Sequence, residues 1–119
     1  MFIVEDEEAL REVYSGFLPL NGFDVVGEAS DGHDAVLQVG ALARRPDVIL
    51  MDHRMPHKSG IEASKEILAR DPGVSIVFVT ADMSVERQAR DVGAKAVLVK
   101  PFAMDELAQA LRQVTAAAK

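Results

Sequence analysis

Short apolar runs alternate with longer amphipathic stretches along the whole chain. Most of the runs are almost continuously apolar, as in strands that are buried on both faces of a parallel sheet. The second run alternates instead and contains Asp24 and Glu28, so we expect it at an edge of the sheet. Strands are predicted at residues 2–4, 24–29, 48–52, 74–79 and 96–99.

The stretches between the runs repeat apolar residues every three or four positions, which is typical of amphipathic helices. In the first helix Leu10, Tyr14 and Leu18 share one face, and Pro19 followed by Asn21-Gly22 is expected to end it. Further helices are predicted at residues 32–43, 61–70, 85–92 and 104–114.

The last two helices are expected to begin differently. Ser84 precedes the fourth and can cap it, because a serine oxygen accepts a hydrogen bond from a free backbone N–H of the first turn. Gly93 is expected to end that helix. Ala103 precedes the fifth helix and has no side-chain acceptor, so a weaker start is expected there.

Five alternations of strand and helix with short links predict an α/β fold with a parallel sheet and helices on both faces. A polar second strand at the edge favours the flavodoxin-like, doubly wound order 2-1-3-4-5. The length of 119 residues suits a single domain, 1–119. Ligands of such folds bind at the carboxyl ends of the strands, here between the first and the third.

The amino-acid composition excludes several classes of function and location for this chain. The chain is 49% hydrophobic and 27% charged, as in an ordinary globular domain. Its net charge of -6 argues against direct binding of nucleic acid, because phosphates require a basic surface. No apolar stretch approaches the roughly 20 residues of a membrane span, and no signal peptide is recognised. The absence of cysteine excludes disulfides and fits the cytoplasm, which is the expected location.

Polar residues follow or end four of the predicted strands, at the carboxyl ends that lie on one side of the sheet. Glu5 and Asp6 follow the first strand, Asp52 ends the third, Thr80 follows the fourth and Lys100 the fifth. Three carboxylates in one cleft repel one another, and a hard divalent cation such as Mg²⁺ removes that cost. With a hydroxyl and an ammonium nearby, the arrangement predicts a site for a phosphoryl group on Asp52, since phosphoryl transfer needs mainly positioning and charge stabilisation.

These residues resemble the receiver domains of two-component response regulators, including the chemotaxis regulators. The resemblance covers essentially the whole chain, and several motifs in the right order and spacing make it specific. The motifs are Val4-Glu5-Asp6-Glu7, Met51-Asp52-His53-Arg54-Met55-Pro56 with Gly60, Val79-Thr80-Ala81 and Val99-Lys100-Pro101-Phe102.

The resemblance implies that Asp52 is the phosphoacceptor for the phosphohistidine of a sensor histidine kinase or a phosphotransfer protein. It also implies that Mg²⁺ is bound directly by Asp6, Asp52 and the main-chain carbonyl of Arg54, with Glu5 acting through water. The domain would assist its own phosphorylation and dephosphorylation without being an enzyme for a separate substrate.

Other roles follow from the same resemblance. Thr80 and Lys100 would hold phosphoryl oxygens, together with the main-chain amides of His53 and Ala81. The Lys100-Pro101 bond is typically cis in the family. The surface formed by the fourth helix, the fifth strand and the fifth helix would change its affinity for a downstream protein or for an output domain of the same polypeptide.

One position departs from the family pattern. Three residues before the lysine the family usually has Tyr or Phe, whose ring moves when the threonine moves, and this chain has Val97. Valine is short and stiff at χ1, so it cannot sweep across the fourth helix. We therefore expect the loop after Thr80 and the fourth helix to carry the change.

Alternatives remain at this point. An aspartyl-phosphate hydrolase also uses Mg²⁺ and an aspartate nucleophile, but such enzymes generally need a second Asp two residues on, where this chain has Arg54. A flavin-binding domain of the same topology needs small or hydroxyl residues in its first loop, and Glu5-Asp6-Glu7 would repel a phosphate. A receiver cut from a longer DNA-binding regulator is also compatible with the sequence.

Overall fold

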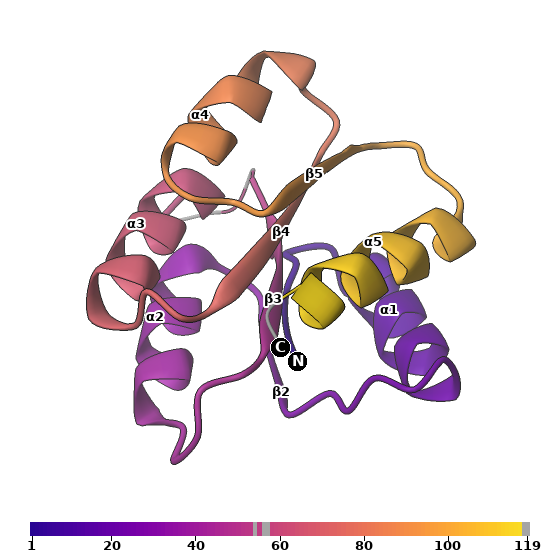
Figure 1. Cartoon of the computed structure of the whole chain (residues 1–119), viewed down its shortest axis with the longest axis horizontal. Coiled ribbons are helices and arrows are strands. Elements are labelled where there is room, and N and C mark those ends of the chain that lie inside the picture. Colours follow the sequence, from indigo (N-terminus) through magenta and orange to yellow (C-terminus); the bar gives the residue numbers. More distant parts are fainter. Residues whose placement is uncertain (54, 56–57, 118–119) are drawn as a thin grey trace.

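A five-stranded parallel sheet forms the centre of the computed structural model, which describes residues 1–53, 55 and 58–117. The strand order is β2-β1-β3-β4-β5, so the polar second strand lies at an edge, as predicted. Figure 1 shows the sheet between two helical layers. The strands are β1 (Phe2–Val4), β2 (Gly27–Ala29), β3 (Val48–Asp52), β4 (Ser75–Thr80) and β5 (Ala96–Val99).

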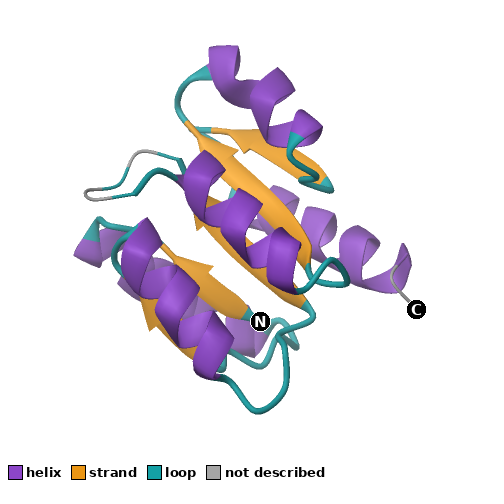
Figure 2. Cartoon of the chain, turned by 90° about the vertical axis from the view of Figure 1, so that its left-hand side faces the viewer, coloured by secondary structure: helices purple, strands orange, loops and turns teal. Residues whose placement is uncertain are grey.

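Helices cover both faces of the sheet, which confirms the flavodoxin-like fold. Helices α2, α3 and α4 lie on one face, where Figure 2 shows them in front of the strands, and α1 and α5 lie on the other. None of the helices in the described part of the chain is long and apolar enough to span a bilayer. The helices are α1 (Glu8–Leu20), α2 (Gly32–Ala41), α3 (Gly60–Arg70), α4 (Glu86–Asp91) and α5 (Met104–Ala117), with a 3-10 turn η1 (Met83–Val85) before α4.

Alternation along the strands divides the core into two clusters. Ile3 and Leu50 pack on the face covered by α1 and α5, whereas their neighbours along the strands pack under the other layer. Successive side chains of a strand point to opposite faces. Glu5 and Asp52, each two residues further on, therefore belong to the α1–α5 side.

The first helix ends at Leu20, directly before the predicted stop at Asn21-Gly22. Pro19, expected to contribute to that stop, lies inside the last turn of α1. Proline lacks an N–H donor but can adopt helical φ, and the loss of one bond in the last turn is tolerated. The stop at Asn21-Gly22 is confirmed: Gly22 has φ +90, and its N–H donates to the carbonyl of Pro19 at 3.2 Å.

The second strand is shorter than residues 24–29. Its three residues pair with β1, from Phe2 with Gly27 to Val4 with Ala29. One further backbone hydrogen bond precedes these pairs, from the Val26 N–H to the Met1 carbonyl at 2.8 Å. The regular pairing with β1 therefore covers only the second half of the segment predicted as a strand.

The fourth helix starts differently from the prediction. Asp82, not Ser84, is the capping residue: its Oδ1 accepts hydrogen bonds from the Ser84 N–H at 2.9 Å and from the Ser84 hydroxyl at 2.6 Å. The chain then forms η1 before α4 begins, because an aspartate side chain readily bonds the backbone two residues on. Gly93, with φ +111, follows the end of α4 as predicted. Before α5, Ala103 lacks a cap, and its N–H donates to Glu106 Oε1 at 3.2 Å instead.

Candidate functional site

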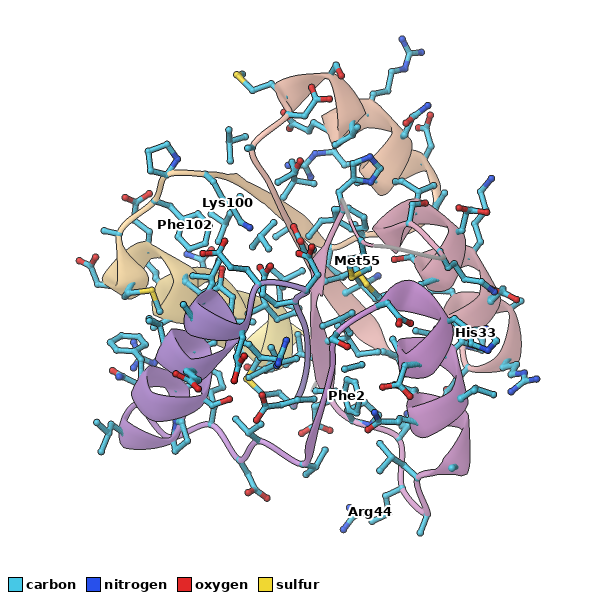
Figure 3. All side chains as sticks on the ribbon, turned by 180° about the vertical axis from the view of Figure 1, so that it is seen from behind. Phe2, His33, Arg44, Met55, Lys100 and Phe102 are labelled. Carbon is cyan, nitrogen blue, oxygen red and sulfur yellow. The ribbon has the colours of Figure 1, made fainter. Side chains whose placement is uncertain are left out.

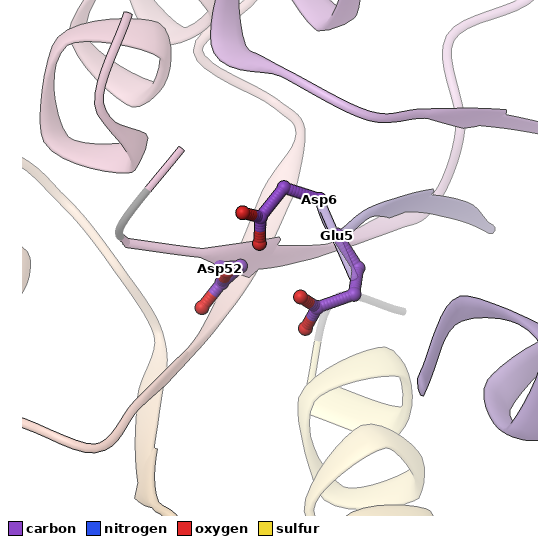
Figure 4. Close-up of side chains that lie close together, drawn as sticks. All are labelled: Glu5, Asp6 and Asp52. Carbon is purple, nitrogen blue, oxygen red and sulfur yellow. The ribbon is translucent and has the colours of Figure 1, made fainter. Parts of the chain in front are cut away.

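Three carboxylates gather where β1 and β3 end. Glu5 and Asp6 directly follow β1, and Asp52 is the last residue of β3. One carboxylate oxygen from each lies within 4.8 Å of the others, and Figure 4 shows the three side chains around the same small volume. The parallel topology thus brings these residues together as expected from the sequence.

Glu5 is fixed by its backbone and its side chain. Its N–H donates to the carbonyl of Ala29 at 3.1 Å, which continues the pairing of β1 with β2. Its carbonyl accepts a hydrogen bond from Arg11 Nη1 at 2.8 Å, and its Oε2 accepts one from the Glu7 N–H at 3.2 Å. Arg11 also pairs with Glu28 of β2 at 3.5 Å. The sequence analysis missed Arg11; a cation in the first turn after the acidic motif was its only signal.

Asp52 is held by close packing of α3 against the end of β3. A side chain at Gly60, the first residue of α3, would overlap the Asp52 carbonyl oxygen and the ring of Phe78. The Gly60 N–H also donates to the carbonyl of His53 at 2.9 Å. A capping box between Ser59 and Glu62 fixes the start of the helix one residue earlier than predicted. Glycine at position 60 is therefore required by the close approach of helix and strand.

Lys100 reaches the carboxylates from the end of β5. Its Nζ lies 3.2 Å from Glu5 Oε1 and 3.4 Å from Asp52 Oδ1. Figure 3 shows Lys100 at the opposite end of the molecule from Arg44. The Lys100-Pro101 bond is cis, as the resemblance implied. A single ammonium against three carboxylates leaves the cluster with an excess of negative charge.

Burial and mutual repulsion shift the pKa values in this cluster. Burial, and then the charge of Asp52, raise the pKa of Glu5 to about 7. Burial likewise raises the pKa of Asp52, although Lys100 opposes it. For Lys100, burial lowers the pKa, but the charges of Asp52 and Glu5 outweigh it, so the pKa is raised. The site therefore favours the charged ammonium of Lys100 and disfavours the simultaneous ionisation of Glu5 and Asp52.

The remaining predicted residues lie beside this cluster. Thr80 ends β4 with 2% of its surface exposed, and its hydroxyl accepts a hydrogen bond from the Asp82 N–H at 3.0 Å. The Lys100 N–H donates to the Thr80 carbonyl at 2.7 Å, which links the two strand ends. His53 directly follows Asp52, and Ala81 follows Thr80. Arg54, expected to offer its carbonyl to a metal, lies outside the described residues.

The donor set suits a hard divalent cation. It consists of carboxylate oxygens, which Mg²⁺ prefers, and their separation leaves room for an ion that keeps several waters. Within residues 1–53, 55 and 58–117, this is the one group of three metal-ligating side chains that lie so close together. An ion there would stabilise the charged form of Glu5, which burial and the charge of Asp52 disfavour.

Comparison with known proteins agrees with this geometry. Residues 1–112 match the response regulator receiver domain family, and receiver domains generally bind Mg²⁺. The transcriptional regulatory protein PdtaR of Mycobacterium tuberculosis is 37% identical over 93% of this chain and 54% of that protein. The chain therefore spans about half the length of this relative. The chemotaxis protein CheY of Thermotoga maritima is 34% identical over 97% of this chain and 96% of that protein.

A solved structure shows the same fold. The receiver domain of the sensor histidine kinase PA1611 from Pseudomonas aeruginosa superposes with a TM-score of 0.85 and 30% identity over 97% of this chain and 95% of that one. That structure holds a magnesium ion coordinated in its active site cleft. From the family match, the relatives and the fold together, we conclude that this chain belongs to the response regulator receiver domains of two-component signalling systems.

Proposed function

We propose that Asp52 accepts a phosphoryl group from a phosphohistidine of a sensor histidine kinase or a phosphotransfer protein. Receiver domains as a family interact with histidine kinases and with downstream partners. The observation that carries the proposal is the position of Asp52, which has 6% of its surface exposed between two further carboxylates and the ammonium of Lys100. Among the described residues, no other aspartate lies beside two further carboxylates and also pairs with a lysine.

The transfer is a displacement at phosphorus. An Oδ atom of Asp52 attacks the phosphorus in line with the leaving imidazole nitrogen. The new P–O bond forms as the P–N bond breaks, and the imidazole leaves with the electron pair and takes up a proton. Lys100, 3.4 Å from Oδ1, then pairs with the phosphoryl oxygens, and the Thr80 hydroxyl and the amides of His53 and Ala81 donate to them.

Mg²⁺ belongs to this proposal. Asp6, Asp52 and the carbonyl of Arg54 would hold it directly, with Glu5 acting through water. When bound, the ion neutralises charge on the carboxylates and on the phosphoryl oxygens. The role of Glu5 is to fix the hydration shell, which its bonds to Lys100 and to the Glu7 N–H support.

The output surface is formed by α4, β5 and α5. If the Thr80 hydroxyl turns to a phosphoryl oxygen, it gives up the hydrogen bond from the Asp82 N–H at the start of η1. All four residues of β5 are half-buried at the sheet edge, so a displaced η1 and α4 would change an accessible surface. The partner of this surface is a downstream protein or an output domain of the same polypeptide, as expected in transcriptional relatives.

We also propose that the chain is a switch and not a turnover enzyme. Arg54 occupies the position where a hydrolase of this chemistry needs a second aspartate. Release of inorganic phosphate from a phosphate ester in excess over protein would support the hydrolase instead. A visible absorption band in the purified protein would support a flavin domain.

The test of the acceptor uses Mg²⁺ and a small-molecule phosphodonor. Mass spectrometry should detect one added phosphoryl group, and Asp52→Asn should abolish it because the amide is a poor nucleophile. Asp47→Asn is the matched control, since this exposed aspartate lies at the other end of β3. Full labelling of the Asp52→Asn protein, or loss of labelling in the Asp47→Asn protein, would contradict the assignment.

A further inference from the structure

Tyr14 carries a buried hydroxyl that the proposed function does not use. It is the single tyrosine of the chain, which also lacks tryptophan. The residue lies on α1 with 1% of its surface exposed, among apolar side chains between this helix and the sheet. Its hydroxyl has no hydrogen-bond partner among the described residues. Buried polar groups nearly always have a partner, so this one requires an explanation.

The phenol lies on the side of the sheet that carries the acidic site. Tyr14 packs in the same cluster as Ile3 and Leu50, and Glu5 and Asp52 lie two residues further along those strands, on the same face. Long side chains on a helix point back toward its N-terminus, and α1 starts three residues after Glu5. This general preference would direct the Tyr14 side chain toward the end of α1 that follows Glu5 and Asp6.

The electrostatics agree with this placement. Burial raises the pKa of the Tyr14 phenol first, followed by the charges of Glu5, Asp52 and Glu7. Because the phenol is buried, solvent screens these charges only weakly, and they act on it directly. Glu5 offers lone pairs beyond those used by Lys100 and by the Glu7 N–H, since a carboxylate has about four acceptor positions.

We propose that Tyr14 is a positioning residue of the metal site, whose hydroxyl donates a hydrogen bond to the Glu5 carboxylate when a divalent cation is bound. This inference rests on the proposed binding of Mg²⁺ at Glu5, Asp6 and Asp52. The added donor stabilises the charged form of Glu5 and fixes the orientation in which it holds the hydration shell of the ion. A phenylalanine would fill the same space without supplying the bond.

The first test compares Mg²⁺ affinity in the wild-type protein and Tyr14→Phe, measured by calorimetric titration. The dissociation constant should rise about tenfold to a hundredfold, because one hydrogen bond to a charged group is lost. The metal-free variant should be at least as stable as the wild type, since an unpartnered hydroxyl is removed. Leu18→Met is the matched control: it alters buried packing one turn along α1, in the same cluster, and should leave the Mg²⁺ affinity unchanged.

The second test uses the spectrum of the single tyrosine. Addition of Mg²⁺ to the wild-type protein should shift the near-ultraviolet absorption of Tyr14 to the red, because its hydroxyl becomes a donor to a carboxylate. In a Glu5→Gln background the shift should be lost, and Tyr14→Phe should cause no further loss of affinity. Such non-additivity separates action through Glu5 from a general effect on the fold.

The outcomes distinguish this inference from the function on which it rests. If the wild-type protein binds Mg²⁺ with no change in the tyrosine spectrum, and Tyr14→Phe binds it equally well, the role of Tyr14 is overturned and the metal site stands. If Tyr14→Phe and Leu18→Met weaken binding equally, the effect is one of packing and the inference is wrong. If the wild-type protein binds no Mg²⁺, the proposed function and the inference fall together.

Discussion

Glu5 carries a charge that is costly in the metal-free chain. Its side chain is 2% exposed, and a single ammonium faces it and Asp52 together. Burial and the charge of Asp52 raise its pKa from 4.5 to about 7, so near neutral pH folding favours the protonated acid. The same charge is what a divalent cation would bind, so a cost to folding and an affinity for metal have one origin.

This pKa shift predicts how stability depends on pH. The raised pKa contributes stability that is fully present below pH 4.5 and is lost as the pH rises through about 7. Glu5→Gln should therefore stabilise the metal-free protein at pH 8 by on the order of 1–3 kcal/mol and have little effect at pH 4. Urea unfolding with a chelator present measures both values. A variant that is less stable than the wild type at pH 8 would contradict this account.

The sequence revealed some site residues and not others for a physical reason. Glu5, Asp52 and Lys100 could be found because each closes an apolar run, and parallel topology brings such ends together. Arg11 and Tyr14 lie within a helix, where their roles depend on which helix face meets which part of the sheet edge. The periodicity correctly placed Tyr14 in the core, but it could not reveal that its hydroxyl lacks a partner there.

At the scale of elements, the site depends on how closely α3 approaches β3. The Asp52 carbonyl lies where a side chain at Gly60 would be, and a backbone atom cannot rotate away from the overlap. The five strands and five α-helices were all predicted from the sequence. Several of their ends were not, because the end of a helix or strand depends on the hydrogen-bond partners that the fold provides. Only three residues of the predicted second strand pair regularly with β1, and Asp82 takes the capping role expected of Ser84.

Gly60→Ala should consequently disturb both the fold and the site. The added methyl group must push α3 away from Asp52, which should cost about 1–3 kcal/mol of unfolding free energy and weaken Mg²⁺ binding. Gly16→Ala is the matched control, because a methyl group there meets no atom within 4 Å, and it should stabilise α1 by about 0.5–1 kcal/mol. Thermal unfolding with and without Mg²⁺ measures both effects. Equal behaviour of the two variants would show that the close approach does not matter.

At the scale of the whole molecule, the site is connected to a distant surface through the ends of β4 and β5. The Thr80 hydroxyl accepts a hydrogen bond from the Asp82 N–H, and the Thr80 carbonyl accepts one from the Lys100 N–H. The two side chains that we propose to hold the phosphoryl group are therefore joined at the end of β4. Val97, where the family usually has an aromatic residue, packs against the core cluster beneath α2, α3 and α4. Because this side chain is short, we expect the loop after Thr80 to connect the site with α4.

This connection predicts where a phosphoryl mimic acts. A ligand shifts a conformational equilibrium only by its differential affinity for the two states, and bonds to Thr80 and Lys100 can supply that difference without an aromatic ring at position 97. With beryllium trifluoride and Mg²⁺, amide NMR shifts should extend through residues 81–92, beyond those caused by Mg²⁺ alone. Thr80→Val, which keeps the branched shape but removes the hydroxyl, should reduce the shifts along 81–92 and spare the one at His53. If the wild-type shifts are confined to residues that touch the mimic, the loop and α4 do not carry the signal, and the domain transfers its phosphoryl group without a large change of surface.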